Sequence, residues 1–253
     1  MTSAPPDPER TTADASAALT LLRASTAALV ADLSAQHWSD LDVGAPTLLP
    51  AWTRGHLLTH LARNADAINR TLAGALRGEI VPRYAGGPAG RDAEIQAGAA
   101  RAMSELVADV IDSAQRLDRV LGAVADADAW QARSAGEHPA RHWLVARLKE
   151  VEIHHVDLAA GYTAEQWPAP MVVHELPRVI ETLAGRSTQS LRVSVDPDGS
   201  TAAELGGACW DVPGTDPAVE VRGPDWAVLA WAVGRPTASL GRLTATPPLA
   251  AWN

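Results

Sequence analysis

Apolar positions recur every three or four residues through the first two-thirds of the chain, the spacing at which they share one face of an α-helix. The pattern predicts helices over about residues 13–35, 54–76, 91–123 and 139–160. The third of these predicted helices has an apolar stripe suited to packing in a bundle, formed by Ala99, Met103, Leu106, Val110, Leu117 and Leu121. Four long amphipathic helices joined by moderate connections are typical of a four-helix bundle.

The predicted helix ends agree with local signals. Thr53 can cap the second helix, and Pro139 suits the first turn of the fourth. Gly161 is a stop signal just beyond the fourth helix, and the Gly- and Pro-rich stretch "VPRYAGGPAG" separates the second helix from the third.

The last third of the chain has a different pattern. A helix is predicted over 171–186, with Pro177 marking either a kink or its true start. Short β-like runs follow at 191–195 and 218–223, and a short apolar helix at 224–234. This mixture predicts a small α+β domain, so we divide the chain into domains at 1–165 and 166–253.

Composition and charge restrict the possible function. The formal net charge of −9 argues against a general nucleic-acid partner, because no basic excess is present to neutralise phosphates. No uninterrupted apolar run suits a membrane span, and the polar, acidic first residues do not resemble a secretory signal. The single cysteine, Cys209, excludes an internal disulfide framework. We therefore expect a cytoplasmic protein without a membrane or nucleic-acid partner.

The segment "EVEIHHVDL" concentrates titratable groups on a helix that should face the core. Glu150 and His154 are four residues apart and share one helical face, and Asp157 lies one turn further along. Burying these groups unpaired would cost several kcal/mol, so a hydrogen bond, a charge partner or a metal must compensate. Helix bundles commonly bind zinc or another divalent ion through a glutamate and a histidine at such a helical spacing.

The second helix offers a third ligand. His56 and His60 are again four residues apart, and His60 lies one turn deeper in the bundle. A set of His60, Glu150 and His154 would leave one position of a tetrahedral ion open, which is the pattern of a catalytic site. The alternatives at this point are a plain polar pair on one helix and a hydrogen-bonded core histidine on the other.

Two motifs carry a resemblance to a known family. The stretch "LLPAWTRGHLLTHLARNADA" followed by "EVEIHHVDL" resembles the mycothiol-dependent maleylpyruvate isomerases, over nearly the whole chain. The resemblance implies a mainly α fold, a DinB-like four-helix bundle followed by a small α+β domain. It implies His60, Glu150 and His154 as the ligands of zinc or another divalent metal. It also implies Arg235, in "AVGRPTA", as the catalytic and substrate-binding arginine, and we add Arg91, in "AGRDAEI", as a second substrate-binding residue.

The same resemblance implies an activity. Mycothiol, a low-molecular-weight thiol, would add as a thiolate to the cis double bond of maleylpyruvate, and rotation and elimination would give fumarylpyruvate, in a site between the two domains. One alternative is a mycothiol S-transferase that uses the same zinc site on another electrophile. Others are a non-catalytic metal-binding bundle and a metal-free interaction protein.

Overall fold

The structure, a computed structural model, describes residues 8–35, 38, 41–198, 203–235 and 241–252, with the backbone alone given for 8–12. It divides into two compact units, residues 1–158 and 159–253. The predicted domain boundary, after residue 165, lies within the short 3₁₀ helix η3 (Ala164–Gln166) of the second unit.

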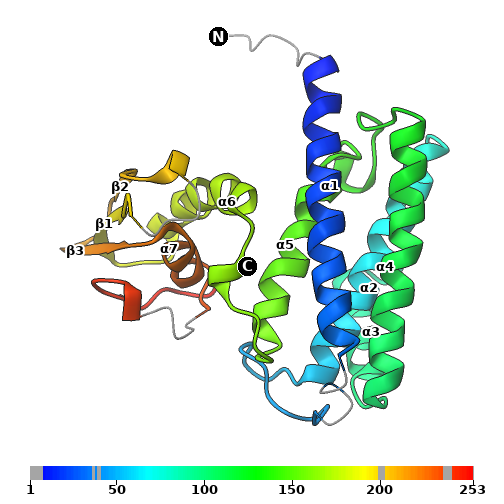
Figure 1. The fold of residues 1–253 in the computed structure, drawn as a ribbon, viewed down its shortest axis with the longest axis horizontal. Helices are drawn as coiled ribbons and strands as arrows, with labels where there is room; N and C mark the ends of the chain where they lie inside the picture. Colours follow the sequence, from blue (N-terminus) through cyan, green and yellow to red (C-terminus); the bar gives the residue numbers. More distant parts are fainter. Residues whose placement is uncertain (1–7, 36–37, 39–40, 199–202, 236–240, 253) are drawn as a thin grey trace. The chain divides into compact units, whose positions relative to one another are not determined.

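The first unit is a bundle of four long helices that run side by side (Figure 1). They are α1 (Pro8–Leu33), α2 (Arg54–Leu76), α4 (Met103–Asp126) and α5 (His142–Asp157). Helix α2 packs against both α4 and α5, and α1 packs mainly against α5. Leucine side chains of all four helices are almost fully buried in the core between them. The prediction of a mainly α chain built on a four-helix bundle is confirmed.

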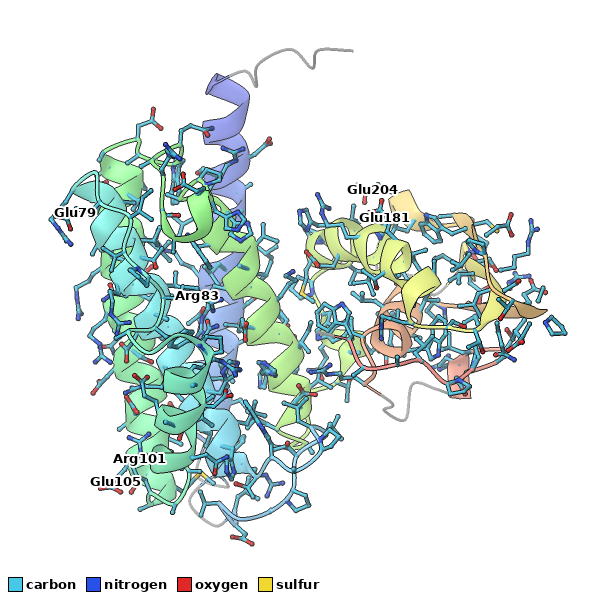
Figure 2. The ribbon with its side chains drawn as sticks, turned by 180° about the vertical axis from the view of Figure 1, so that it is seen from behind. Glu79, Arg83, Arg101, Glu105, Glu181 and Glu204 are labelled. Carbon is cyan, nitrogen blue, oxygen red and sulfur yellow. The ribbon has the colours of Figure 1, made fainter. Side chains whose placement is uncertain are left out.

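One predicted helix, 91–123, is wrong as a single element. The structure has two helices there, α3 (Gly87–Gly98) and α4, separated by a turn in which Ala102 is extended (ψ 147°). The Glu105 carboxylate, at the start of α4 in Figure 2, accepts the Ala102 N–H at 3.1 Å, and Arg101 Nε donates to the Gly98 carbonyl at 3.1 Å. These side chains satisfy backbone groups that a continuous helix would pair internally, which stabilises the break.

The fourth helix begins later than predicted. Pro139 takes part in an isolated antiparallel bridge with Arg133, and α5 begins at His142. The connection before α5 includes the 3₁₀ helix η2 (Ala135–Glu137), in which Gly136 has φ 68°. Proline therefore precedes the helix here instead of opening it.

The close approach of α2 to the α3–α4 turn gives a stability prediction. A Cβ added to Gly55 would lie 1.9 Å from the Ala99 carbonyl oxygen, which is backbone and cannot turn away. We expect Gly55→Ala to lower the free energy of unfolding by roughly 1–3 kcal/mol, the usual cost of overpacking. Urea unfolding measures it. The matched control is Gly90→Ala, whose added Cβ meets nothing within 4 Å; equal stability of the two variants would contradict the prediction.

The second unit is a three-stranded sheet with two main helices. The strands β1 (Gln189–Val195), β2 (Cys209–Val212) and β3 (Asp216–Gly223) lie in the order β2-β1-β3, with β1 antiparallel to β2 and parallel to β3. Helices α6 (Ala169–Thr182) and α7 (Asp225–Ala232) pack on each other and contact the strands. The prediction of a small α+β unit is confirmed.

Two details of this unit differ from the sequence-based prediction. Strand β2, in "CWDV", was not predicted because only one of its four residues is buried, so its hydrophobic pattern is weak. Pro177 lies inside α6, so the predicted alternative that the helix starts at this proline is wrong.

Helix α1 contains a long, largely apolar segment. By length and composition, Ala13–Leu33 could cross a membrane, although the core helices of soluble proteins pass the same criterion. The segment includes Arg23, which pairs with Asp118 of α4 at 2.6 Å. The first seven residues, on which part of the secretory-signal prediction falls, lie outside the described residues.

Candidate active site

The start of α2 sets the position of His60. Thr53 caps the helix: its hydroxyl accepts the His56 N–H at 3.4 Å, and His56 Nδ1 accepts the Thr53 N–H at 3.3 Å. The other ring nitrogen of His56 lies 3.2 Å from Gln96 Oε1. His56 is thus part of the helix cap, while His60, one turn deeper, is buried in the bundle with 3% of its side chain exposed.

Three side chains from two helices, one buried and two partly buried, converge in the first unit. His60 Nε2 lies 2.8 Å from Glu150 Oε2, and His154 Nε2 lies 3.2 Å from the same oxygen. One ligand atom from each of the three residues lies within 4.8 Å of the others. The helical spacing of Glu150 and His154 places both on the face of α5 that meets α2.

Asp157 fixes the orientation of His154. Its buried carboxylate lies 2.8 Å from His154 Nδ1, so this nitrogen carries a proton and donates a hydrogen bond to Asp157. The other nitrogen, Nε2, is then directed at Glu150. Metal-binding histidines are commonly held in this way, with one nitrogen on a carboxylate and the other on the ion.

The protonation states in the cluster follow from burial and hydrogen bonding. Burial lowers the pKa of His60 to about 4, so this ring is neutral at pH 7. Burial alone would raise the pKa of Glu150, but hydrogen bonds from His154 and His60 hold it well below its usual value. Burial opposes the charged form of His154, yet its hydrogen bonds to Asp157 and Glu150 raise its pKa. The Glu150 carboxylate and the neutral His60 imidazole are therefore in the protonation states in which these side chains bind metals.

Arg91 lies next to the cluster. Its Nη2 is 3.3 Å from His60 Nδ1, and its guanidinium lies over the Trp52 ring at 5.9 Å. Because arginine only donates, Nδ1 accepts here and the proton of His60 sits on Nε2. Binding an ion through Nε2 would move that proton to Nδ1, so Arg91 would have to turn away. Its side chain is 31% exposed, which leaves room for that movement.

The donor set fits a divalent metal. Two imidazole nitrogens and one carboxylate oxygen are ligands that zinc accepts, and their separation allows one ion to reach all three. The buried hydroxyl of Tyr84 interacts with Arg91. Arg91 and Glu150 both affect the pKa of Tyr84, which burial raises, so this hydroxyl belongs to the same neighbourhood.

Comparison with known proteins identifies the family. Residues 19–159 match the family model described as the mycothiol maleylpyruvate isomerase N-terminal domain, which is more than half of the chain. The chain belongs to the mycothiol-dependent maleylpyruvate isomerase family. No curated protein matches the sequence.

Solved structures agree with this family assignment. A crystal structure of the mycothiol-dependent maleylpyruvate isomerase is 26% identical and has a TM-score of 0.77, with 94% of this chain and 97% of that chain covered. A crystal structure of a variant of it, in which a histidine is replaced by alanine, gives the same values. The alignment extends through both units, which confirms the predicted fold class.

Arg235, the remaining residue suggested by the resemblance to this isomerase family, belongs to the second unit. It follows α7, and 8% of it is exposed. Its backbone N–H donates to the Ala230 carbonyl at 2.8 Å, its Nη1 donates to the Val233 carbonyl at 2.6 Å, and its guanidinium lies over the Trp252 ring at 6.0 Å. The role of Arg235 stays a prediction.

Two aromatic residues near the cluster of this family member were not predicted. The Trp52 ring meets His60 edge-on at a centroid distance of 5.4 Å, and Tyr84 lies in the loop before α3. Trp52 directly precedes the helix cap, and its place in "LLPAWT" is the only sequence signal that could have indicated it.

Proposed function

We propose that this chain is an enzyme that isomerises maleylpyruvate to fumarylpyruvate, with mycothiol as the thiol cofactor and zinc held by His60, Glu150 and His154. The observation that carries the proposal is the meeting of these three ligand atoms in the part of the chain that matches the family. The similarity to the isomerase structure over 94% of the chain supports the same activity.

Each residue of the cluster has a defined task in this proposal. A divalent ion held there would lower the pKa of a bound thiol, so that a thiolate is available near neutral pH. Asp157 holds His154 by its Nδ1, so that Nε2 would be the nitrogen available to a metal. The buried His60 is neutral at pH 7, so it could hold a metal after its single proton moves from Nε2 to Nδ1, with no second proton to lose.

The substrate imposes a further requirement. Maleylpyruvate has carboxylates and a double bond conjugated to a carbonyl, and the bond can rotate only while a nucleophile has temporarily turned it into a single bond. A guanidinium binds a carboxylate through two parallel hydrogen bonds, so arginine is the suitable holder. Arg91, beside His60, and Arg235 are assigned this role.

Metal analysis followed by an activity comparison tests the proposal. The purified chain should contain close to one equivalent of zinc and should convert maleylpyruvate only when mycothiol is added. Monobromobimane serves as a general electrophile in the same preparation. Faster mycothiol-dependent consumption of monobromobimane, without isomerisation, would favour the S-transferase alternative. A metal-free chain with neither activity would contradict both the isomerase proposal and the S-transferase alternative.

Asp157 provides a test of the metal site that does not depend on the substrate. We expect Asp157→Asn to weaken zinc binding by about tenfold or more, because the charged acceptor of His154 Nδ1–H is lost. Competition with a chromogenic chelator measures the affinity. The matched control is Asp32→Asn, which changes the analogous partner of His155, at 3.2 Å, outside the cluster. Equal zinc affinity in the two variants would contradict the role given to Asp157.

A further inference from the structure

A cavity separate from the metal cluster lies in the first unit, between α1 and α4. It has a volume of about 530 Å³, which is within the range of small-molecule sites. Most of its wall is aliphatic, formed by Leu22, Ala27, Val30, Ile111, Ala114, Leu117 and Leu121. None of these residues belongs to the metal cluster.

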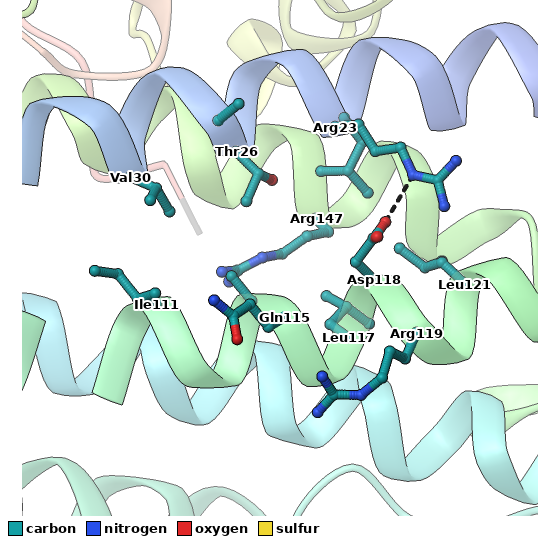
Figure 3. Close-up of a pocket in the computed structure, with 13 residues that line it drawn as sticks. Arg23, Thr26, Val30, Ile111, Gln115, Leu117, Asp118, Arg119, Leu121 and Arg147 are labelled. Carbon is teal, nitrogen blue, oxygen red and sulfur yellow. Dashed lines mark hydrogen bonds and ion pairs between the residues drawn. The ribbon is translucent and has the colours of Figure 1, made fainter. Parts of the chain in front are cut away.

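Arg147 reaches this cavity from α5 and lies between α1 and α4 in Figure 3. It is among the most buried side chains, with 1% exposed. Its Nη1 donates to the Leu61 carbonyl at 3.0 Å and to Asn64 Oδ1 at 2.8 Å. Neither Nε nor Nη2 forms a hydrogen bond with a described residue, so the edge of the guanidinium that suits a carboxylate is unused.

No described carboxylate forms an ion pair with Arg147. The acidic residue that lines the same cavity, Asp118, is already paired with Arg23 at 2.6 Å (Figure 3). Burial lowers the pKa of Arg147 to about 10, so the group is still a cation at neutral pH. The carboxylates of Glu150 and Asp66 favour the charged form of Arg147 electrostatically but form no ion pair with it, and its neutral hydrogen bonds compensate for the burial of the charge only in part.

We propose that this cavity binds a small organic carboxylate with an apolar body, the carboxylate against Arg147 and the body against the aliphatic wall. A carboxylate would use the free edge of the guanidinium through two parallel hydrogen bonds. The wall favours a hydrocarbon chain or ring over a sugar or a phosphate ester, because most of its surface is apolar even though Thr26, Gln115 and Arg119 also line it. None of the residues that line the cavity is a proposed metal ligand, although Arg147 lies one turn before Glu150 on α5 and interacts with it electrostatically.

Calorimetric titration of the full chain with octanoate tests this site, and 1-octanol is the uncharged comparison. The two probes share the same apolar body, so a difference in affinity reports the charge. We expect octanoate to bind roughly ten- to hundredfold more tightly than octanol, as a hydrogen-bonded charge pair would give. Equal affinities, or no binding of octanoate, would overturn the proposal.

Three variants test whether octanoate binds in this cavity. Arg147→Met should remove the preference for octanoate, and Ala114→Leu, which fills the cavity wall, should weaken both probes. Arg141→Met makes the same chemical change on an arginine that bonds Gln131 outside the cavity and should change neither affinity. If Arg147→Met does not fold, the Ala114→Leu variant decides the question. Unchanged octanoate affinity in Ala114→Leu would mean that octanoate binds outside this cavity, and the proposal would fail.

Discussion

Replacement of His60 by alanine is expected to remove the bound metal and to lower isomerase turnover by at least about a thousandfold. His60 supplies one of only three protein ligands in the proposed site, and two ligands hold a divalent ion poorly. The loss of rate corresponds to roughly 4 kcal/mol of transition-state stabilisation. Metal content by mass spectrometry and initial rates with maleylpyruvate and mycothiol measure the two effects on the same sample.

His56→Ala is the matched control for this experiment. It makes the same change one turn earlier on α2, at a residue that belongs to the helix cap. Loss of the cap costs about 1 kcal/mol of stability but should leave metal content and rate within a few-fold of the wild type. Circular dichroism establishes that both variants are folded. A His60→Ala variant that is active without metal would refute the assignment of the cluster.

Much of the fold follows from the spacing of apolar residues, and the exceptions have local causes. The apolar residues from Met103 to Leu121 have helical spacing because they pack in the bundle core. Helix α4 can therefore be predicted from the sequence. The break before it, at residues 99–102, contains no proline and only good helix-forming residues. The side chains of Glu105 and Arg101 stabilise the break, which lies where Ala99 closely approaches Gly55, and helix propensity encodes neither feature.

The candidate site divides in the same way. The shared face of Glu150 and His154 follows from helical geometry alone. Their meeting with His60 depends on how α2 and α5 pack, which the family motif suggested and which the sequence pattern alone left open. Trp52 and Tyr84 precede helices in loops, where periodicity carries no information. The sequence also could not predict that Arg147 forms no ion pair with the carboxylate lining its cavity, since this depends on the pairing of Asp118 with Arg23.

Arg235→Met gives the second large expected effect, a fall of about tenfold to a hundredfold in kcat/KM for maleylpyruvate. The size is that of one charge-assisted contact to a substrate carboxylate. In a cobalt-substituted sample, the absorption change on adding thiol should be unaltered, because the metal ligands remain. Arg235→Lys should restore little, since an ammonium group keeps the charge but cannot form two parallel hydrogen bonds.

The result separates a substrate contact from a purely structural role. Arg235 also donates to the Val233 carbonyl, so its loss lowers the free energy of unfolding, by roughly 1 kcal/mol for one hydrogen bond. A structural residue would change stability without a selective effect on the substrate. Arg192→Met, on the exposed face of β1, is the control and should leave kcat/KM unchanged. If Arg235→Met is destabilised but has normal kcat/KM, the carboxylate must be held by other residues, and Arg91, 3.3 Å from His60, is the next to replace.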